Sequence, residues 1–425
     1  MLKKLSFLVL AGGLLNVASA QFLAPDLFNE AADNRDAATG QSVIAGLGAD
    51  PSVTHIEFIG LNSHALASGA QAITLNLGRQ LDLIARVDET YALDEETIAW
   101  SGTIDLDINS GKTNATLFGQ EQAADKANGA VFVVNGERVH GQIDIDGLIY
   151  EILTVEEGGH YLLVQRDFSQ LPDGDDTPAK ANPLIGYVDA ADEQTLMNTS
   201  IRVLQFASVE ARNQLGGSNA AKDRMRFFLA QANRVYANNG IQARLANAGV
   251  RTPNISQNTN NADTLLNRLT NGSDGFYDQF AGSVRNNTSA DLVGFITADG
   301  LFFRFNGQNF GLCGIADAIA ANANQAFFLV NHTCTNFTFV HEIGHLFGAR
   351  HDNDPTTTPF AFGHGFVNNA GNFRTVMAVN SNPQPRIGFF STDDQRRNGQ
   401  ALGNASFADN ERVHQQRRGA MSRFR

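Results

Sequence analysis

A run of eleven residues, from His341 to His351, constrains this chain more than any other part of its sequence. Residues four apart lie on one face of an α-helix, so His341 and His345 can direct ring nitrogens at the same point. Gly348 tolerates the positive φ needed where the helix ends and the chain turns back. His351 then brings a third imidazole to that point. The run therefore predicts a helix that ends at a glycine and carries a metal site.

Three neutral imidazoles suit a tetrahedral zinc ion and leave its fourth position open for water. Zinc lowers the pKa of a bound water from about 15.7 to about 7, and a carboxylate beside it can take the proton. Glu342 is that carboxylate. We therefore expect one Zn²⁺ per chain, held by His341, His345 and His351, with Glu342 as the base. The HExxH part alone also occurs in ordinary helices, but the glycine and the third histidine extend it.

The motif and a methionine at Met377 together match the metzincin signature with its Met-turn. Residues 185–425 resemble the reprolysin-like branch of the metzincins, and most of all the secreted bacterial peptidyl-Asp metalloendopeptidases. Ala378 and Val379 follow the methionine, which argues against the variant with a tyrosine ligand. The resemblance is carried by Phe337–Val340, Gly363–Phe366, Phe373–Met377, Pro385–Ser391, Asn398–Gly403 and Ala408–Val413.

This resemblance implies a zinc endopeptidase that acts on polypeptides and cleaves before aspartate. In that architecture the chain beyond the Met-turn walls the primed-side pocket, and Arg386 is the only charged residue between Ala378 and Ser391. Arg386 is thus the expected reader of aspartate, with Arg374 and Arg350 as competitors. Arg386 could instead cap a loop or form a surface ion pair.

Other functions remain open from the sequence: an endopeptidase of broad or other specificity, a hydrolase of a non-peptide amide, or an inactive zinc-bearing adhesin. The intact Glu342 argues against the last of these.

Asp352 is expected to orient nearby backbone or a ligand histidine. His364, between two glycines, is expected to bond backbone rather than zinc. His332 and His414 have weaker claims still. The Asn- and Asp-rich loops leave calcium possible, and we expect no nucleic-acid partner.

The N-terminus has the features of a secretory signal peptide over residues 1–20. Lys3 and Lys4 precede an apolar run, and Ala18–Ala20 supplies the small residues for cleavage before Gln21. The alternative is a buried N-terminal helix. The apolar run is too short for a membrane span, and no later run reaches about 18 apolar residues. We expect a secreted protein without a membrane anchor.

Cys313 and Cys334 are the only cysteines, and an even pair in a secreted chain indicates one disulfide before the zinc helix, although two free thiols are the alternative. With no cysteine between Gln21 and Pro183, a thiolate cannot hold the zinc in a precursor. If the enzyme is made as an inactive precursor, something other than a cysteine must keep it inactive.

Length and charge indicate such a precursor. The chain has 425 residues, enough for two cores. Residues 1–182 hold 26 acidic and 10 basic side chains, net −16, whereas residues 183–425 hold 18 and 21, net +3. One interpretation is an acidic propeptide domain (21–172) that covers and inhibits an arginine-rich protease domain (185–425). The other is that acidic surfaces keep an exported protein soluble.

The polar segment 173–184 reads as a linker and processing region. It carries Asp173, Asp175 and Asp176, before which an Asp-directed enzyme could cut itself, and Lys180, at which another protease could act. A linker carboxylate could also occupy the open zinc position before cleavage.

Hydrophobic patterning predicts an α+β chain. The first half alternates apolar and polar residues at 73–77, 102–108 and 141–146, typical of an antiparallel sheet with one wet face. Its four histidines, at 55, 64, 140 and 160, lack ligand spacing. The second half predicts a mixed sheet with helices. Strands are expected at 200–206, 241–246, 292–297 and 326–330, and helices at 220–237, 336–347 and 411–421.

Overall fold

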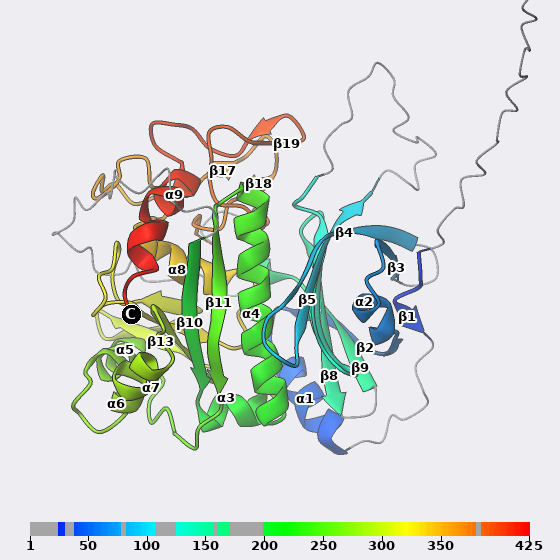
Figure 1. The fold of residues 1–425 in the computed structure, drawn as a ribbon, viewed down its shortest axis with the longest axis horizontal. Coiled ribbons are helices and arrows are strands. Elements are labelled where there is room, and N and C mark those ends of the chain that lie inside the picture. Colours follow the sequence, from blue (N-terminus) through cyan, green and yellow to red (C-terminus); the bar gives the residue numbers. More distant parts are fainter. Residues whose placement is uncertain are drawn as a thin grey trace, which may run out of the picture.

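The computed structural model describes residues 24–29, 38–77, 82–106, 125–156, 160–170, 199–379 and 384–425. They form two units that lie side by side, an N-terminal unit up to residue 170 and a C-terminal unit from residue 199 (Figure 1). The expected signal peptide and the linker 173–184, with its aspartates and Lys180, lie outside the described residues. None of the described helices is long and apolar enough to cross a membrane.

The N-terminal unit is a nine-stranded sheet in the order β1-β2-β9-β8-β7-β6-β5-β4-β3, antiparallel at every pairing. A turn at Asn135-Gly136 joins β6 to β7, with Gly136 at a φ of 60°. The elements are β1 (Phe28–Asn29), α1 (Ala38–Ala49), β2 (Val53–Leu61), α2 (Ser63–Ala67), β3 (Ala72–Asn76), β4 (Asp82–Ala92), β5 (Ile98–Asp105), β6 (Gly129–Asn135), β7 (Arg138–Ile145), β8 (Leu148–Glu156), β9 (His160–Arg166) and the short 3-10 helix η2 (Phe168–Gln170).

The expectation of one wet face for this sheet is wrong, because both faces are covered at its centre. Every residue of β6 except Asn135 is buried. Phe132 belongs to an internal core with Trp100 and the α2 residues. Val131 and Val133, on the other face, belong to a core shared with the C-terminal unit. The alternation seen in sequence separates two buried faces rather than a dry face from a wet one.

The C-terminal unit is built on a five-stranded sheet in the order β11-β10-β12-β16-β15. The first four strands run parallel and β15 is antiparallel at the edge. Its elements are β10 (Thr199–Ala207), α3 (Val209–Gln214), α4 (Ser218–Asn239), β11 (Ala243–Arg251), α5 (Ala262–Thr270), α6 (Asp278–Ala281), α7 (Ser283–Asn287), β12 (Leu292–Thr297), β13 (Phe302–Phe305), β14 (Gln308–Gly311), β15 (Gly314–Ala316), β16 (Phe327–Asn331), α8 (Thr338–Phe347), β17 (Val367–Asn368), β18 (Phe373–Arg374), β19 (Arg396–Arg397), β20 (Gln400–Ala401) and α9 (Asn410–Met421).

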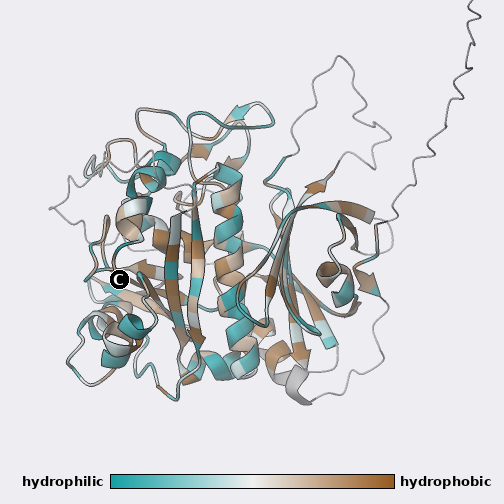
Figure 2. Ribbon diagram, viewed as in Figure 1, coloured by the Kyte–Doolittle hydropathy of each residue, from teal (hydrophilic) through white to brown (hydrophobic). Residues whose placement is uncertain are grey.

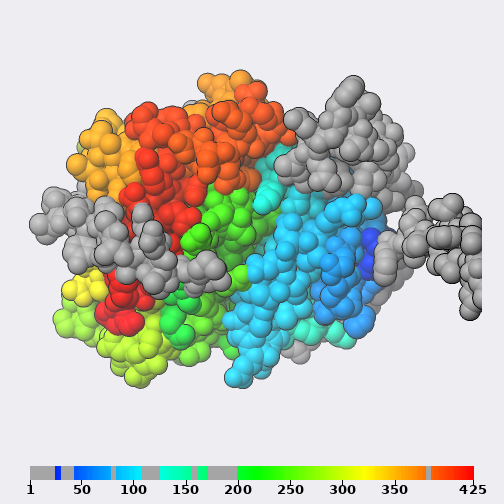
Figure 3. Space-filling model, turned by 45° about the horizontal axis from the view of Figure 1, so that its top comes forward, coloured from blue at the N-terminus to red at the C-terminus, as the bar shows by residue number. Residues whose placement is uncertain are grey.

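Helix α4 forms the boundary between the two units (Figure 1). Much of its length is hydrophilic (Figure 2), yet most of its residues are buried, because the C-terminal sheet covers one side and the N-terminal sheet the other. In the space-filling view the two units are in direct contact along this boundary (Figure 3).

Ion pairs that cross this boundary mostly take their carboxylate from the N-terminal unit, in keeping with the charge difference between the halves of the sequence. The pairs are Arg224–Glu151, Arg226–Asp94, Arg244–Glu89, Arg397–Asp125 and Arg397–Asp146, with Arg138–Asp223 as the reverse case.

Candidate metal centre

The predicted zinc ligands meet at one point. Helix α8 presents His341 and His345 on one face, and it ends at Gly348, whose φ is 115°. The chain then returns His351 to the same face, and the three Nε2 atoms lie 3.1 Å from one another in each pairing. All three side chains are buried. The run from His341 to His351 thus forms the helix end and the cluster of three histidines that its spacing predicted.

This geometry fits zinc. A tetrahedral ion with nitrogen ligands at about 2.0–2.1 Å needs those nitrogens about 3.3 Å apart. The other nitrogens of two rings are engaged by main-chain carbonyls: His341 Nδ1 donates to Val376 O (2.8 Å) and His345 Nδ1 donates to Ala349 O (2.9 Å). Those bonds leave each Nε2 as the lone-pair donor toward the cluster. Burial, then the neighbouring histidines, lowers the pKa of His351 well below its usual value, which favours the neutral ligand form.

The predicted Met-turn lies directly beneath the histidines. A Cβ placed at Gly344 would lie 2.5 Å from Met377 Sδ, so only glycine lets the zinc helix rest on this methionine. Asp352 Oδ1 accepts a hydrogen bond from Val379 N at 3.0 Å. The carboxylate after the third histidine therefore orients the backbone that follows the Met-turn.

Glu342 is fully buried and lies against the edge strand β15 at Gly314. The residue before that strand, Cys313, forms a disulfide with Cys334, as the sequence predicted. Cys313 O also accepts from Asn331 N at 2.7 Å. The bridge ties the start of the edge strand to the loop that leads into the zinc helix.

The two arginines expected near the substrate, one on each side of Met377 in the chain, come together. Arg374 and Arg386 are paired in a parallel bridge and are both buried. Arg374 Nη1 and Arg386 Nη2 donate to the same acceptor, Ala378 O, at 2.5 and 3.1 Å. Arg386 Nη1 also donates to Asn336 O at 3.0 Å. Both arginines line a cavity of about 160 Å³.

The other candidates from the sequence have different partners. Arg350 forms an ion pair with Asp354 (2.6 Å). It does not line the cavity of Arg374 and Arg386. His364 bonds the carbonyls of Thr356 and Phe407, as expected for a loop histidine. His332 bonds Gln214, and His414 bonds the carbonyl of Asn410. Within the described part of the chain, His341, His345 and His351 are the one group of three or more His, Cys, Asp or Glu residues placed to hold a metal.

Comparison with known proteins agrees with this centre. The family model described as metallo-peptidase family M12 matches residues 187–391. A peptidyl-Asp metalloendopeptidase of Stenotrophomonas maltophilia is 31% identical over 98% of this chain and 98% of its own length. This chain belongs to metallopeptidase family M12. It is a zinc metalloendopeptidase, as the motif and the resemblance predicted.

A second relative of this M12 metallopeptidase, the peptidyl-Asp metalloendopeptidase of Xanthomonas campestris pv. campestris, is 32% identical over 88% of the chain and 87% of its own length. Among solved structures, metalloproteinase-II from Bacteroides fragilis overlaps 73% of this chain and 86% of its own, at 11% identity and a TM-score of 0.39.

No pattern in the sequence indicated what the N-terminal unit of the metallopeptidase contributes near these arginines. Gly147 of the β7–β8 turn and Ile149 of β8 complete the cavity of Arg374 and Arg386, together with Asp167, Phe168 and Ser169. A Cβ at Gly147 would lie 2.7 Å from Pro385, the neighbour of Arg386. The β7–β8 turn is therefore packed against the wall of the cavity.

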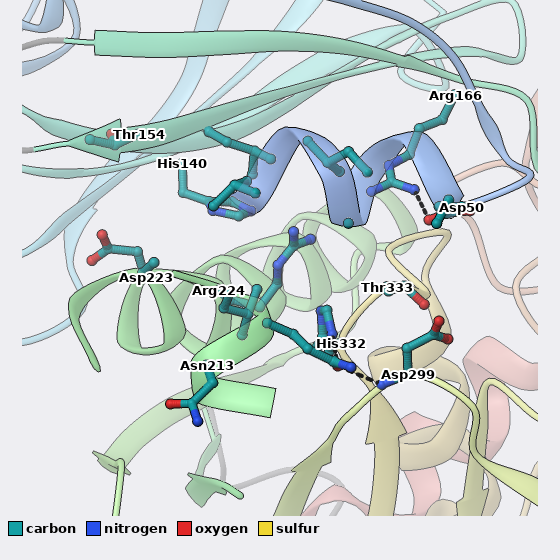
Figure 4. A pocket seen from close by; sticks show the side chains of 18 of the residues that line it. Asp50, His140, Thr154, Arg166, Asn213, Asp223, Arg224, Asp299, His332 and Thr333 are labelled. Carbon is teal, nitrogen blue, oxygen red and sulfur yellow. Dashed lines mark hydrogen bonds and ion pairs between the residues drawn. The ribbon is translucent and has the colours of Figure 1, made fainter. Parts of the chain in front are cut away.

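A larger cavity, about 300 Å³, lies between the two units (Figure 4). Residues of both units face it: Asp50, His140 and Arg166 from the N-terminal unit, and Asp223, Arg224 and His332 from the other. Burial lowers the pKa of His140 to about 4 and that of His332 to about 3, with Arg224 as the next cause for both. None of the zinc ligands lines this cavity. It is part of the boundary between the units, not of the metal centre.

Proposed function

We propose that this zinc metalloendopeptidase uses Glu342 as its general base and cleaves peptide bonds on the amino side of aspartate. The observation that carries the proposal is the triangle of Nε2 atoms, 3.1 Å on each side, with the buried Glu342 next in sequence to the first ligand.

The histidines would hold the ion and Glu342 would move the proton. When bound, zinc supplies a Lewis acid that polarises the substrate carbonyl and makes a water acidic near neutral pH. Glu342 accepts the proton from the attacking water and then delivers it to the nitrogen of the leaving amine. The edge of β15 offers main-chain groups to which an extended substrate can add as a further strand.

The preference for aspartate rests on Arg374 and Arg386. Two guanidinium groups that share the carbonyl of Ala378 place two positive charges close together beside Met377. A substrate carboxylate that reached both groups would accept charge-assisted hydrogen bonds from them. The names of the two relatives, peptidyl-Asp metalloendopeptidases, favour the same preference.

The N-terminal unit is proposed to be a propeptide that inhibits the enzyme within the same chain, after export directed by residues 1–20. Its acidic side chains pair with arginines of the C-terminal unit, and its β7–β8 turn packs on the wall of the arginine cavity. The proposed boundaries stay at 21–172 for the propeptide, 173–184 for the linker and 185–425 for the protease. Removal of the unit would uncover the cavity.

Sequencing the new N-termini in a digest of a denatured protein tests the specificity. Aspartate should be strongly enriched as the first residue of the products, and a chelator should abolish the digestion. A profile without enrichment of aspartate would leave a zinc endopeptidase of another specificity. A digest of cell-wall polymer, run in parallel, should show no chelator-sensitive release.

A further inference from the structure

We infer that Gly314 is a positioning residue for Glu342: the lack of a side chain on this edge-strand residue creates the space in which the Glu342 carboxylate sits. The inference rests on the role proposed above for Glu342 and adds a second residue to that site.

The contact is direct. A Cβ built at Gly314 would lie 2.6 Å from Oε1, 2.8 Å from Cγ and 2.9 Å from Cδ of Glu342. Contacts shorter than 3.0 Å are essentially never made by real Cβ atoms, and ordinary contact begins at 3.4 Å. Any side chain at position 314 would therefore push the carboxylate away by about 0.8 Å or force the strand and the helix apart.

The strand cannot easily move away. Gly314 pairs with Val330 of β16, and its neighbour Cys313 is fixed by the disulfide and by the hydrogen bond from Asn331 N.

The helix is fixed as well. Ala320 N and Ala321 N, which follow the edge strand, donate to His345 O and Leu346 O of α8, each at 2.9 Å. With both elements held, the carboxylate of Glu342 has to give way.

Glycine is not needed at position 314 for its backbone conformation. Gly314 is not among the glycines whose φ lies between 20° and 160°. An alanine at this position would therefore cause no backbone strain from a positive φ. The effect of a substitution would come from the contact with Glu342. Gly311, at the end of β14, is a matched control because its φ is also ordinary and a Cβ there would meet nothing within 4 Å.

The first experiment measures turnover of Gly314→Ala and Gly311→Ala, each made as the full chain and then freed of the N-terminal unit by the same added protease. Because a displacement near 1 Å can cost about 100-fold in rate, we expect kcat of Gly314→Ala to fall by about that factor, with KM and zinc content unchanged. Gly311→Ala should match wild type. Normal kcat for Gly314→Ala, or a rise in KM alone, would overturn the inference, since the residue would then act on substrate binding or not at all.

The second experiment needs no activity. Melting temperatures of the metal-free chains are compared for wild type, Gly314→Ala, Glu342→Ala and the double variant. Overpacking should lower the melting temperature of Gly314→Ala by about 4 °C or more, and the same substitution in the Glu342→Ala background should cost almost nothing. An equal loss in both backgrounds, or a double variant that fails to fold, would overturn the inference, because the strain would then not lie against Glu342.

Comparing Gly314→Ala with Glu342→Gln distinguishes a failure of this inference from a failure of the proposed mechanism. An active Glu342→Gln variant would refute the role of Glu342, whereas an inactive Glu342→Gln together with a normal Gly314→Ala would refute only the role of Gly314.

Discussion

Replacing Glu151 should loosen the attachment of the N-terminal unit. Glu151 is fully buried at the boundary, where its carboxylate accepts from Arg166 Nε at 2.7 Å, pairs with Arg224 of α4, and lies 3.4 Å from His140 Nε2. Burial raises the pKa of this carboxyl, but the charges of Arg224 and Arg166 outweigh burial and hold the pKa well below its usual value. The group is therefore ionised wherever the chain is folded near neutral pH.

The size of the effect follows from what each arginine retains in Glu151→Gln. Arg166 keeps Asp50 (2.7 Å) and the hydroxyl of Ser52 (2.8 Å). Arg224, which is 2% exposed, loses its carboxylate partner and stays buried. Removing one member of a buried ion pair costs about 3–5 kcal/mol. In a unit of this size that corresponds to a fall of roughly 10 °C in melting temperature.

Thermal unfolding of the Glu342→Gln chain, which we expect to remain uncut, is the assay, with and without Glu151→Gln. Limited digestion by an added protease should separate the N-terminal unit faster in the Glu151 variant. Glu57→Gln is the control, because Glu57 lies 3.8 Å from His55 in an exposed pair and should change stability by less than about 0.5 kcal/mol. A loss below about 1 kcal/mol for Glu151→Gln would refute the idea that this carboxylate holds the two units together.

Three further predictions concern specificity, pH and maturation. Arg386→Ala should reduce cleavage before aspartate by about 100-fold relative to cleavage before neutral residues, measured from product N-termini, and an unchanged profile would contradict the proposed pocket. His140 has its pKa lowered to about 4 by burial and Arg224, so its neutral form contributes stability that is complete above about pH 6.5 and is lost as the pH falls toward 4. In His140→Gln the loss of unfolding free energy between about pH 7.5 and pH 4.5 should be about 2.5 kcal/mol smaller, and an equal loss would exclude this histidine as the cause. Wild type should cut its own linker before Asp173, Asp175 or Asp176, whereas purified Glu342→Gln should not, and the same trimming in both would show that another protease acts.

Short-range spacing explains why the metal centre was predictable. The two ligands on α8 are set by helical periodicity, and Gly348 ends the helix where the sequence indicated. The strand at Leu292–Thr297 coincides with its prediction because an apolar run forms a fully buried strand. The end of α4 was marked by Gly240, whose φ is 69°.

Contacts between distant segments could not be predicted in the same way. The pairing of Arg374 with Arg386 depends on the register between the segment just before Met377 and a segment after it. The seat of Glu342 depends on Gly314, which reaches α8 only through the order of strands in the sheet. The second covered face of the N-terminal sheet depends on α4, about 100 residues further along the chain. Periodicity shows that a face is buried but not what buries it.

The most direct test of this account is zinc content and turnover measured on the same preparation of Glu342→Gln, after the N-terminal unit has been removed from it and from wild type by the same added protease. The amide keeps the size of the side chain but cannot accept the proton. We predict one zinc per chain, as in wild type, and a loss of turnover of about 1000-fold or more. Proteolysis near the wild-type rate by the zinc-loaded variant would contradict the assignment of Glu342 as the general base.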